Sequence, residues 1–120
     1  MKDFMLIFRD SLQSEERFAN LSPEQMQAEL AKWGVWTGIL AQQGKIGGGE
    51  ALMAHGKVVH GTKKKITDGP YTEGKDIIGG YLLVKANDIN EAIELSKGCP
   101  VLETDGGSVE VREVLPTQQE

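Results

Sequence analysis

Apolar segments of two different periodicities alternate along this chain of 120 residues. Four segments have the composition of β-strands: 4–9, 51–66, 77–84 and 109–115. Apolar residues recur at helical spacing in two further segments, 22–44 and 88–98. The order β-α-β-β-α-β is typical of the ferredoxin-like split βαβ fold, an α+β class in which an antiparallel sheet carries both helices on one face.

The first predicted helix has clear signals at both of its ends. Ser22 can cap it, Pro23 takes the first helical position, and Gln25 completes a capping box. Gly44 ends the helix after about six turns. A glycine-rich junction at 44–49 then separates this helix from the exposed strands at 51–66.

The predicted sheet has more apolar surface than two helices can cover. Along 4–9 and 77–84, apolar side chains alternate onto both faces, so that Met5 and Ile7 point away from the predicted core. A soluble monomer rarely exposes such a patch, and a second copy of the same sheet is the simplest cover. We therefore expect a homodimer whose sheets pack face to face.

Composition excludes several classes of protein. The length fits a single domain over 1–120, and the net charge of −5 argues against direct nucleic-acid binding. The apolar runs fall short of the ~20 residues of a membrane span, and the N-terminal run is too short for a signal peptide. Cys99 is the single cysteine, which agrees with a reducing compartment. We expect a soluble, cytoplasmic protein without contact to a membrane.

A polar segment at 67–76 holds the main candidates for chemistry. Asp68 could act as a catalytic general base, and Tyr71, Glu73 and Lys75 could bind a ligand at the edge of a pocket. The alternative is structural, because Asp68 also suits a turn in which its carboxylate hydrogen-bonds the backbone.

Two histidines precede that segment. His60 is a further candidate ligand-binding residue, since a neighbouring carboxylate such as Asp68 could orient its ring. His55 lies five residues away and would point to the opposite face of a strand, which argues against a shared metal ion. We predict no metal site and no cofactor; the alternative for both histidines is an exposed loop.

Charged side chains on the first and last strands form another candidate set. Arg9, Glu110 and Arg112 would face the cavity between two paired sheets, where charges must be paired. Such a pair can give specificity to an interface. Arg9 and Arg112 could also bind a carboxylate or phosphate ligand.

Five segments form a distinctive pattern: Thr67–Asp76, Ile77–Tyr81, Asn90–Leu95, Cys99–Pro100 and Val109–Arg112. They resemble the YCII-related family, and specifically its Asp-Gly-Pro-Phe (DGPF) branch. The resemblance implies a ferredoxin-like fold that pairs into a dimeric α+β barrel. It also implies a transcription-regulator partner, because relatives are often fused to or encoded beside sigma-factor-like regulators.

The chain departs from the family pattern at a few positions. Tyr71 stands where the branch has Phe, Asp76 where it has Glu, and Glu113 where it has Pro. Other branches have been proposed to use a His–Asp pair with the histidine on the first helix. The helix predicted at 22–44 has no histidine, so that pair is not carried over.

Two functions stay open on these grounds. The first is binding of a small polar or anionic metabolite in a cleft of a dimeric α+β barrel, with acid/base catalysis by Asp68 if a reaction occurs. The second is a non-catalytic dimeric interaction or regulatory module linked to sigma-factor-type regulators.

Overall fold

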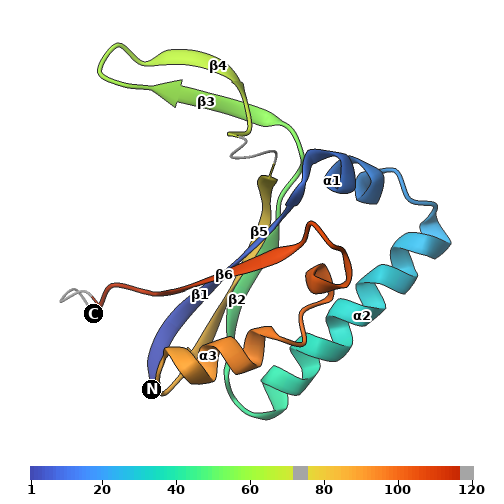
Figure 1. Ribbon diagram of the computed structural model, residues 1–120, viewed down its shortest axis with the longest axis vertical. Coiled ribbons are helices and arrows are strands. Elements are labelled where there is room, and N and C mark those ends of the chain that lie inside the picture. The colour runs from blue at the N-terminus through green and yellow to red at the C-terminus, as the bar shows by residue number, and fades with distance from the viewer. Residues whose placement is uncertain (72–75, 117–120) are drawn as a thin grey trace.

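The structure is a computed structural model that describes residues 1–71 and 76–116. It is a mixed α+β domain in which helices lie on one side of an antiparallel sheet (Figure 1). The elements follow one another as β1 (Lys2–Ser11), α1 (Leu12–Ala19), α2 (Pro23–Gln42), β2 (Ile46–Ala51), β3 (Gly56–His60), β4 (Lys65–Gly69), β5 (Asp76–Ala86), α3 (Ile89–Ser96), the 3₁₀ helix η1 (Pro100–Glu103) and β6 (Ser108–Glu113).

The main sheet has four strands in the order β2-β5-β1-β6, and every neighbouring pair is antiparallel. The central strands β1 and β5 pair along their whole length, from Lys2 opposite Ala86 to Ser11 opposite Asp76. Strands β1, β5 and β6 occupy three of the predicted segments. These strands carry the core of the domain on the face toward the helices.

The second strand of the sheet differs from the prediction. We expected it within 51–66, but the sheet strand is the glycine-rich β2, and residues 56–69 form a separate hairpin, β3–β4. A Cβ atom at Gly49 would lie 2.5 Å from the carbonyl oxygen of Tyr81. Glycine therefore permits β2 to approach β5 closely, although glycine in a sequence is usually a sign of a turn or a bulge.

Local capping signals explain the helices. Ser22 accepts a hydrogen bond from the backbone N–H of Gln25, and the Gln25 side chain accepts one from the backbone N–H of Ser22, as the sequence predicts. Asp88 caps α3 through the N–H of Glu91. The sequence did not predict α1, which begins after Ser11 and buries none of its residues. None of the helices in 1–71 and 76–116 is long and apolar enough to span a membrane.

The core lies between one face of the sheet and the helices α2 and α3. Its largest fully buried side chains come from β1, β5 and α2: Phe4, Leu6, Leu40, Ile77 and Val84. Trp36 and Ala92 join this cluster from α2 and α3. The alternation of β1 therefore directs its phenylalanines inward, because successive side chains point to opposite faces of a sheet.

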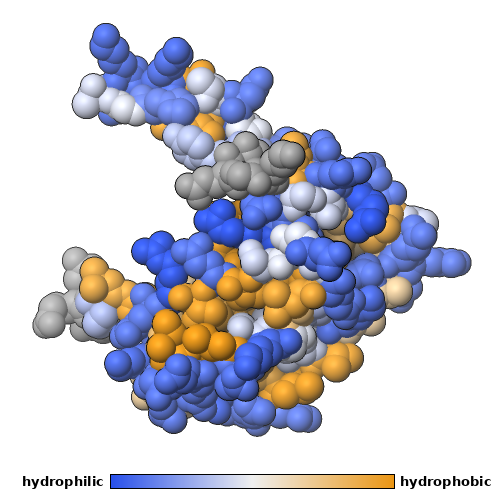
Figure 2. Space-filling model, viewed as in Figure 1, coloured by the Kyte–Doolittle hydropathy of each residue, from blue (hydrophilic) through white to orange (hydrophobic). Residues whose placement is uncertain are grey.

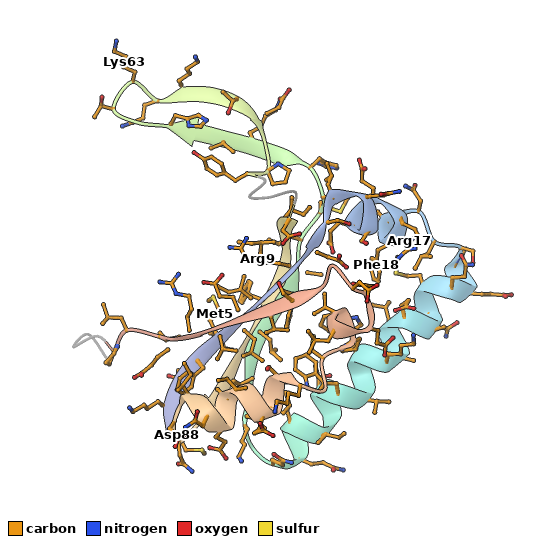
Figure 3. All side chains as sticks on the ribbon, in the orientation of Figure 1. Met5, Arg9, Arg17, Phe18, Lys63 and Asp88 are labelled. Atoms are coloured by element: carbon orange, nitrogen blue, oxygen red, sulfur yellow. The ribbon has the colours of Figure 1, made fainter. Side chains whose placement is uncertain are left out.

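The opposite face of the sheet is open. Met5 and Arg9 project from β1 on the side away from the helices (Figure 3). Ile7 lies between them, in register with Tyr81 of β5 and Glu110 of β6. These side chains are only half-buried, so the face is apolar but uncovered by the described residues.

The hairpin β3–β4 projects from the body of the molecule. Figure 2 shows hydrophilic residues at its tip, and apolar side chains gathered on the body where β6 crosses β1. Val59 and Ile66 face one another across the hairpin and are 61% and 65% exposed. A two-stranded hairpin is only marginally stable by itself in water, so this exposed apolar pair favours contact with another surface.

Candidate functional site

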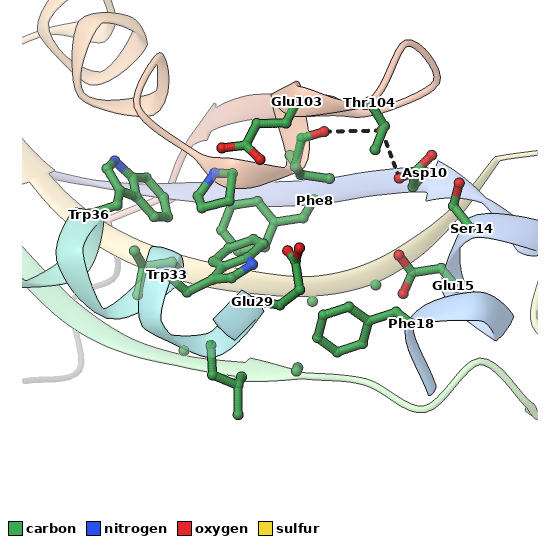
Figure 4. A pocket seen from close by; sticks show the side chains of 18 of the residues that line it. Phe8, Asp10, Ser14, Glu15, Phe18, Glu29, Trp33, Trp36, Glu103 and Thr104 are labelled. Atoms are coloured by element: carbon green, nitrogen blue, oxygen red, sulfur yellow. Dashed lines mark hydrogen bonds between the residues drawn. The ribbon is translucent and has the colours of Figure 1, made fainter. Parts of the chain in front are cut away.

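A cavity of about 670 Å³ lies between the helix-covered face of the sheet and the helices α1 and α2 (Figure 4). The short helix η1 adds a further wall. This volume is in the usual range of small-molecule sites, which combine apolar walls with a few polar groups. The cavity is therefore the candidate functional site.

Three aromatic rings form one wall of the cavity. Phe8 of β1 lies edge to face with Trp33 and Trp36 of α2, at centroid distances of 5.0 and 5.9 Å, and the two indoles are 5.8 Å apart. The indole Nε1–H of Trp36 donates to the carbonyl of Leu95 at 3.0 Å. Phe18 of α1 adds a fourth ring on the other side of the cavity, near Glu15. This wall is held rigidly because each ring of the trio packs against the other two.

Carboxylates dominate the polar part of the lining. Four of the lining residues present one to the cavity: Asp10, Glu15, Glu29 and Glu103. Glu50 is in register with Tyr81, so its side chain lies on the open face of the sheet. Asp10 is 5% exposed. Its Oδ2 accepts a hydrogen bond from the hydroxyl of Thr104 at 2.9 Å, and its Oδ1 accepts one from the backbone N–H of Ser11 at 2.8 Å. Asp10 is therefore held in one orientation at the end of β1.

Glu15 reaches the cavity from α1 and lies over a glycine of the sheet. A Cβ atom at Gly79 would be only 2.8 Å from Cδ of Glu15, so the missing side chain leaves the space that this carboxyl group occupies. Burial, and then the negative charge of Asp10, raise the pKa of Glu15. The protonated form of Glu15 is thus favoured by its surroundings.

Glu29 and Glu103, in contrast to Glu15, both form an ion pair with Lys32. Nζ of Lys32 donates to Oε1 of Glu29 at 3.3 Å and to Oε1 of Glu103 at 3.0 Å, which links α2 to η1 at the edge of the cavity. Hydrogen bonds to Glu103 and Glu29 raise the pKa of Lys32. Within 1–71 and 76–116, neither Asp10 nor Glu15 has a cation at ion-pair distance.

The residues predicted at the polar segment lie outside this cavity. Asp68 is in β4, where its side chain is 87% exposed and accepts a hydrogen bond from Nζ of Lys57. Nε2 of His60 is 2.7 Å from Oγ1 of Thr67, and Nδ1 of His60 is 3.2 Å from the Tyr71 hydroxyl. The structure thus brings His60 and Tyr71 together, whereas Asp68 is not among the residues that line the cavity.

The other two residues predicted in that segment, Glu73 and Lys75, lie outside the described residues. His55 is exposed before β3. The catalytic role of Asp68 stays a prediction, and the geometry directs attention to the cavity instead.

The predicted arginines lie on the open face of the sheet. Nε of Arg9 donates to Oε1 of Glu110 at 3.3 Å, which is the pairing expected between the first and last strands. Arg112 is exposed and in register with Met5. Neither arginine lines the cavity, because both point to the opposite face of the sheet.

Sequence reasoning missed the residues that do line the cavity. Side chains of β1 alternate between the two faces of the sheet, and this alternation places Asp10 on the inward face after Phe8. A carboxylate on an inward apolar face indicates a special environment, so the sequence pattern could have identified Asp10. Glu15 had no such signal, because α1 was not predicted. Trp33 lies within the apolar pattern of 22–44, and that pattern predicts a helix without indicating a binding site.

The raised pKa of Glu15 predicts a pH-dependent stability. Because the folded state holds the Glu15 proton above the ordinary pKa near 4.5, the native state binds more protons than the unfolded state just above that pH. This contribution to stability therefore falls as pH rises through the folded pKa. Glu15→Gln should remove the fall and stabilise the protein near neutral pH, by less than about 1 kcal/mol because solvent screens a half-buried carboxyl.

Urea unfolding from about pH 4 to about pH 8 checks this expectation. Glu16→Gln is the matched control, since Glu16 is exposed on the same helix and does not line the cavity. Parallel pH profiles for the wild type and Glu15→Gln would contradict the assignment.

A search of curated proteins finds no match for this chain. The model of the YCII-related domain family matches residues 3–118, which is nearly the whole chain and includes every element that forms the cavity. The chain therefore belongs to the YCII-related domain family.

Proposed function

We propose that this protein binds a small organic molecule in the cavity between the sheet and the helices α1 and α2. The observation that carries the proposal is an aromatic-walled volume of about 670 Å³ with the buried Asp10 and the half-buried Glu15 at one end. Rigid apolar walls supply affinity, and the few polar groups supply orientation. Bound there, a ligand would touch Phe8 and Trp33 on one side and Glu15 on the other.

The same geometry favours exchange of a proton with the ligand. Burial, and then the negative charge of Asp10, raise the pKa of Glu15. A carboxyl group whose pKa is raised in this way is a common candidate for general acid/base chemistry. In this proposal Glu15 takes the role that the sequence suggested for Asp68.

The two tryptophans of the chain both line the cavity, so they report directly on its occupancy. We expect small aromatic fragments to shift the indole N–H signals of Trp33 and Trp36 in a ¹⁵N-labelled sample. Ser14→Phe should weaken this binding about tenfold or more, because Ser14 lines the cavity and the larger side chain fills it.

Gln13→Phe is the matched control for that experiment. It adds the same ring to the same helix at an exposed position that does not line the cavity. If no fragment shifts the indole signals of the wild type, or if Ser14→Phe binds fragments as the wild type does, the proposed function is wrong.

We also propose a ferredoxin-like domain of the DGPF branch that pairs through its open sheet face into a dimeric α+β barrel. The sheet order β2-β5-β1-β6 and the Asp68–Pro70 motif support the domain type. The half-buried apolar residues Met5 and Ile7 support the pairing, since a second copy would remove them from water.

An interaction module is the second candidate function. The projecting hairpin favours it, because Val59 and Ile66 are exposed there on a unit that needs support from another surface. A second copy of the chain is the partner that we assign to this surface, and a transcription regulator is the alternative from the sequence.

A further inference from the structure

We propose that the ligand of the cavity is an organic cation: a primary ammonium group carried on an apolar or aromatic body. This inference rests on the proposed function and names its class of ligand. It differs from the anionic ligand that the sequence suggested from the arginines, which lie on the other face of the sheet.

The charges of the lining support a cation. Among the described residues of the lining, four present carboxylates to the cavity and only Arg17 carries a positive charge, on an exposed side chain. Glu29 and Glu103 both form ion pairs with Lys32, so the protein itself neutralises them. Asp10 and Glu15 have no such cation among the described residues, so a positively charged ligand group would complement them.

The hydrogen-bonding capacity of the cavity near Asp10 and Glu15 also fits an ammonium group. Asp10 accepts one hydrogen bond at each oxygen, from Ser11 and Thr104, and an ionised carboxylate can accept about four. An ammonium group has three donors and no acceptor, so it complements two adjacent carboxylates. An anion would meet like charge instead.

The aromatic walls fit the remainder of such a ligand. Figure 4 shows Glu15 and Phe18 on one side of the cavity and the Trp33–Trp36 pair on the other. Aromatic faces attract cations and also bury apolar groups, and tryptophan does so best. A ligand with a charged end and a ring would therefore satisfy both parts of the lining at once.

The test uses three probes that share a phenylethyl body. 2-Phenylethylamine is cationic at neutral pH, 2-phenylethanol is neutral, and 3-phenylpropanoate is anionic. Binding is followed by the indole N–H signals and by calorimetry on the full chain. We expect the amine to bind about tenfold or more tighter than the alcohol, and the propanoate to bind most weakly.

Substitutions of neighbouring glutamates make the test specific. Glu15→Gln should weaken binding of the amine about tenfold while leaving the affinity for the alcohol unchanged, whereas Glu16→Gln should affect neither probe. Affinity for the amine should also rise with pH as Glu15 loses its proton, and this rise should disappear in Glu15→Gln.

The outcomes distinguish failure of the cation proposal from failure of the proposed binding site. If the alcohol or the propanoate binds in the cavity as tightly as the amine, the cation proposal is wrong and the binding site stands. Equal loss of amine affinity in Glu15→Gln and Glu16→Gln would also overturn the cation proposal. If none of the three probes binds while other fragments still shift the indole signals, the cation proposal fails alone.

Discussion

Replacing Trp36 by alanine should lower the free energy of unfolding by about 3–5 kcal/mol. The indole is 5% exposed and packs edge to face against Phe8 and Trp33. Its Nε1–H also satisfies the carbonyl of Leu95, which would lose its partner. A Cβ atom at Gly98 would be 2.8 Å from Cδ1 of Trp36, so the chain after α3 is packed directly on this ring.

Urea unfolding measures this loss of stability, and two further variants serve as controls. Trp36→Phe keeps an aromatic ring and removes the donor, so it should cost less than the alanine variant. Val35→Ala changes an exposed neighbour, 67% accessible on the same helix, and should cost little. A loss below about 1 kcal/mol in Trp36→Ala would mean that Trp36 does not anchor α2 to the sheet.

Replacing Ile7 by glutamate should convert the proposed dimer into a folded monomer. Ile7 lies at the centre of the open face, in register with Tyr81 and Glu110. The new carboxylate would be placed beside that of Glu110, and burying it unpaired between two sheets would be costly. We expect the dimer dissociation constant to rise about a hundredfold or more.

Sedimentation equilibrium at micromolar concentrations tests the pairing. Val35→Glu adds the same charge to an exposed position of α2, outside both the open face and the cavity, and should leave the dimer intact. Circular dichroism of Ile7→Glu should show that the monomer is still folded, since the substituted side chain lies outside the core. A wild-type protein that is monomeric under these conditions would contradict the pairing.

If the pairing holds, it also explains why Arg9 and Glu110 are paired on a face that carries the apolar Met5 and Ile7. A charge buried between two sheets is tolerated only with a partner, and the hydrogen bond from Arg9 to Glu110 supplies one within each chain. The cavity lies on the opposite face of the sheet, so loss of the dimer should leave the cavity itself in place.

Local signals determined much of this fold. The capping box at Ser22 and the helical spacing that follows it predicted α2, and the helical spacing of apolar residues over 88–98 predicted α3. The alternation of β1 predicted which side chains enter the core, because the period of a strand is independent of its neighbours. These features depend on residues a few positions apart, which is why the sequence by itself determined them.

Only the tertiary structure decided the second strand and the candidate site. Gly49 belongs to a strand because β5 passes within contact of it, and no local pattern carries that information. The cavity joins Asp10 of β1, Glu15 of α1, Trp33 of α2 and Thr104 after η1, which are far apart along the chain. Their shared surroundings also raise the pKa of Glu15, since burial and the charge of Asp10 exist only after the chain has folded.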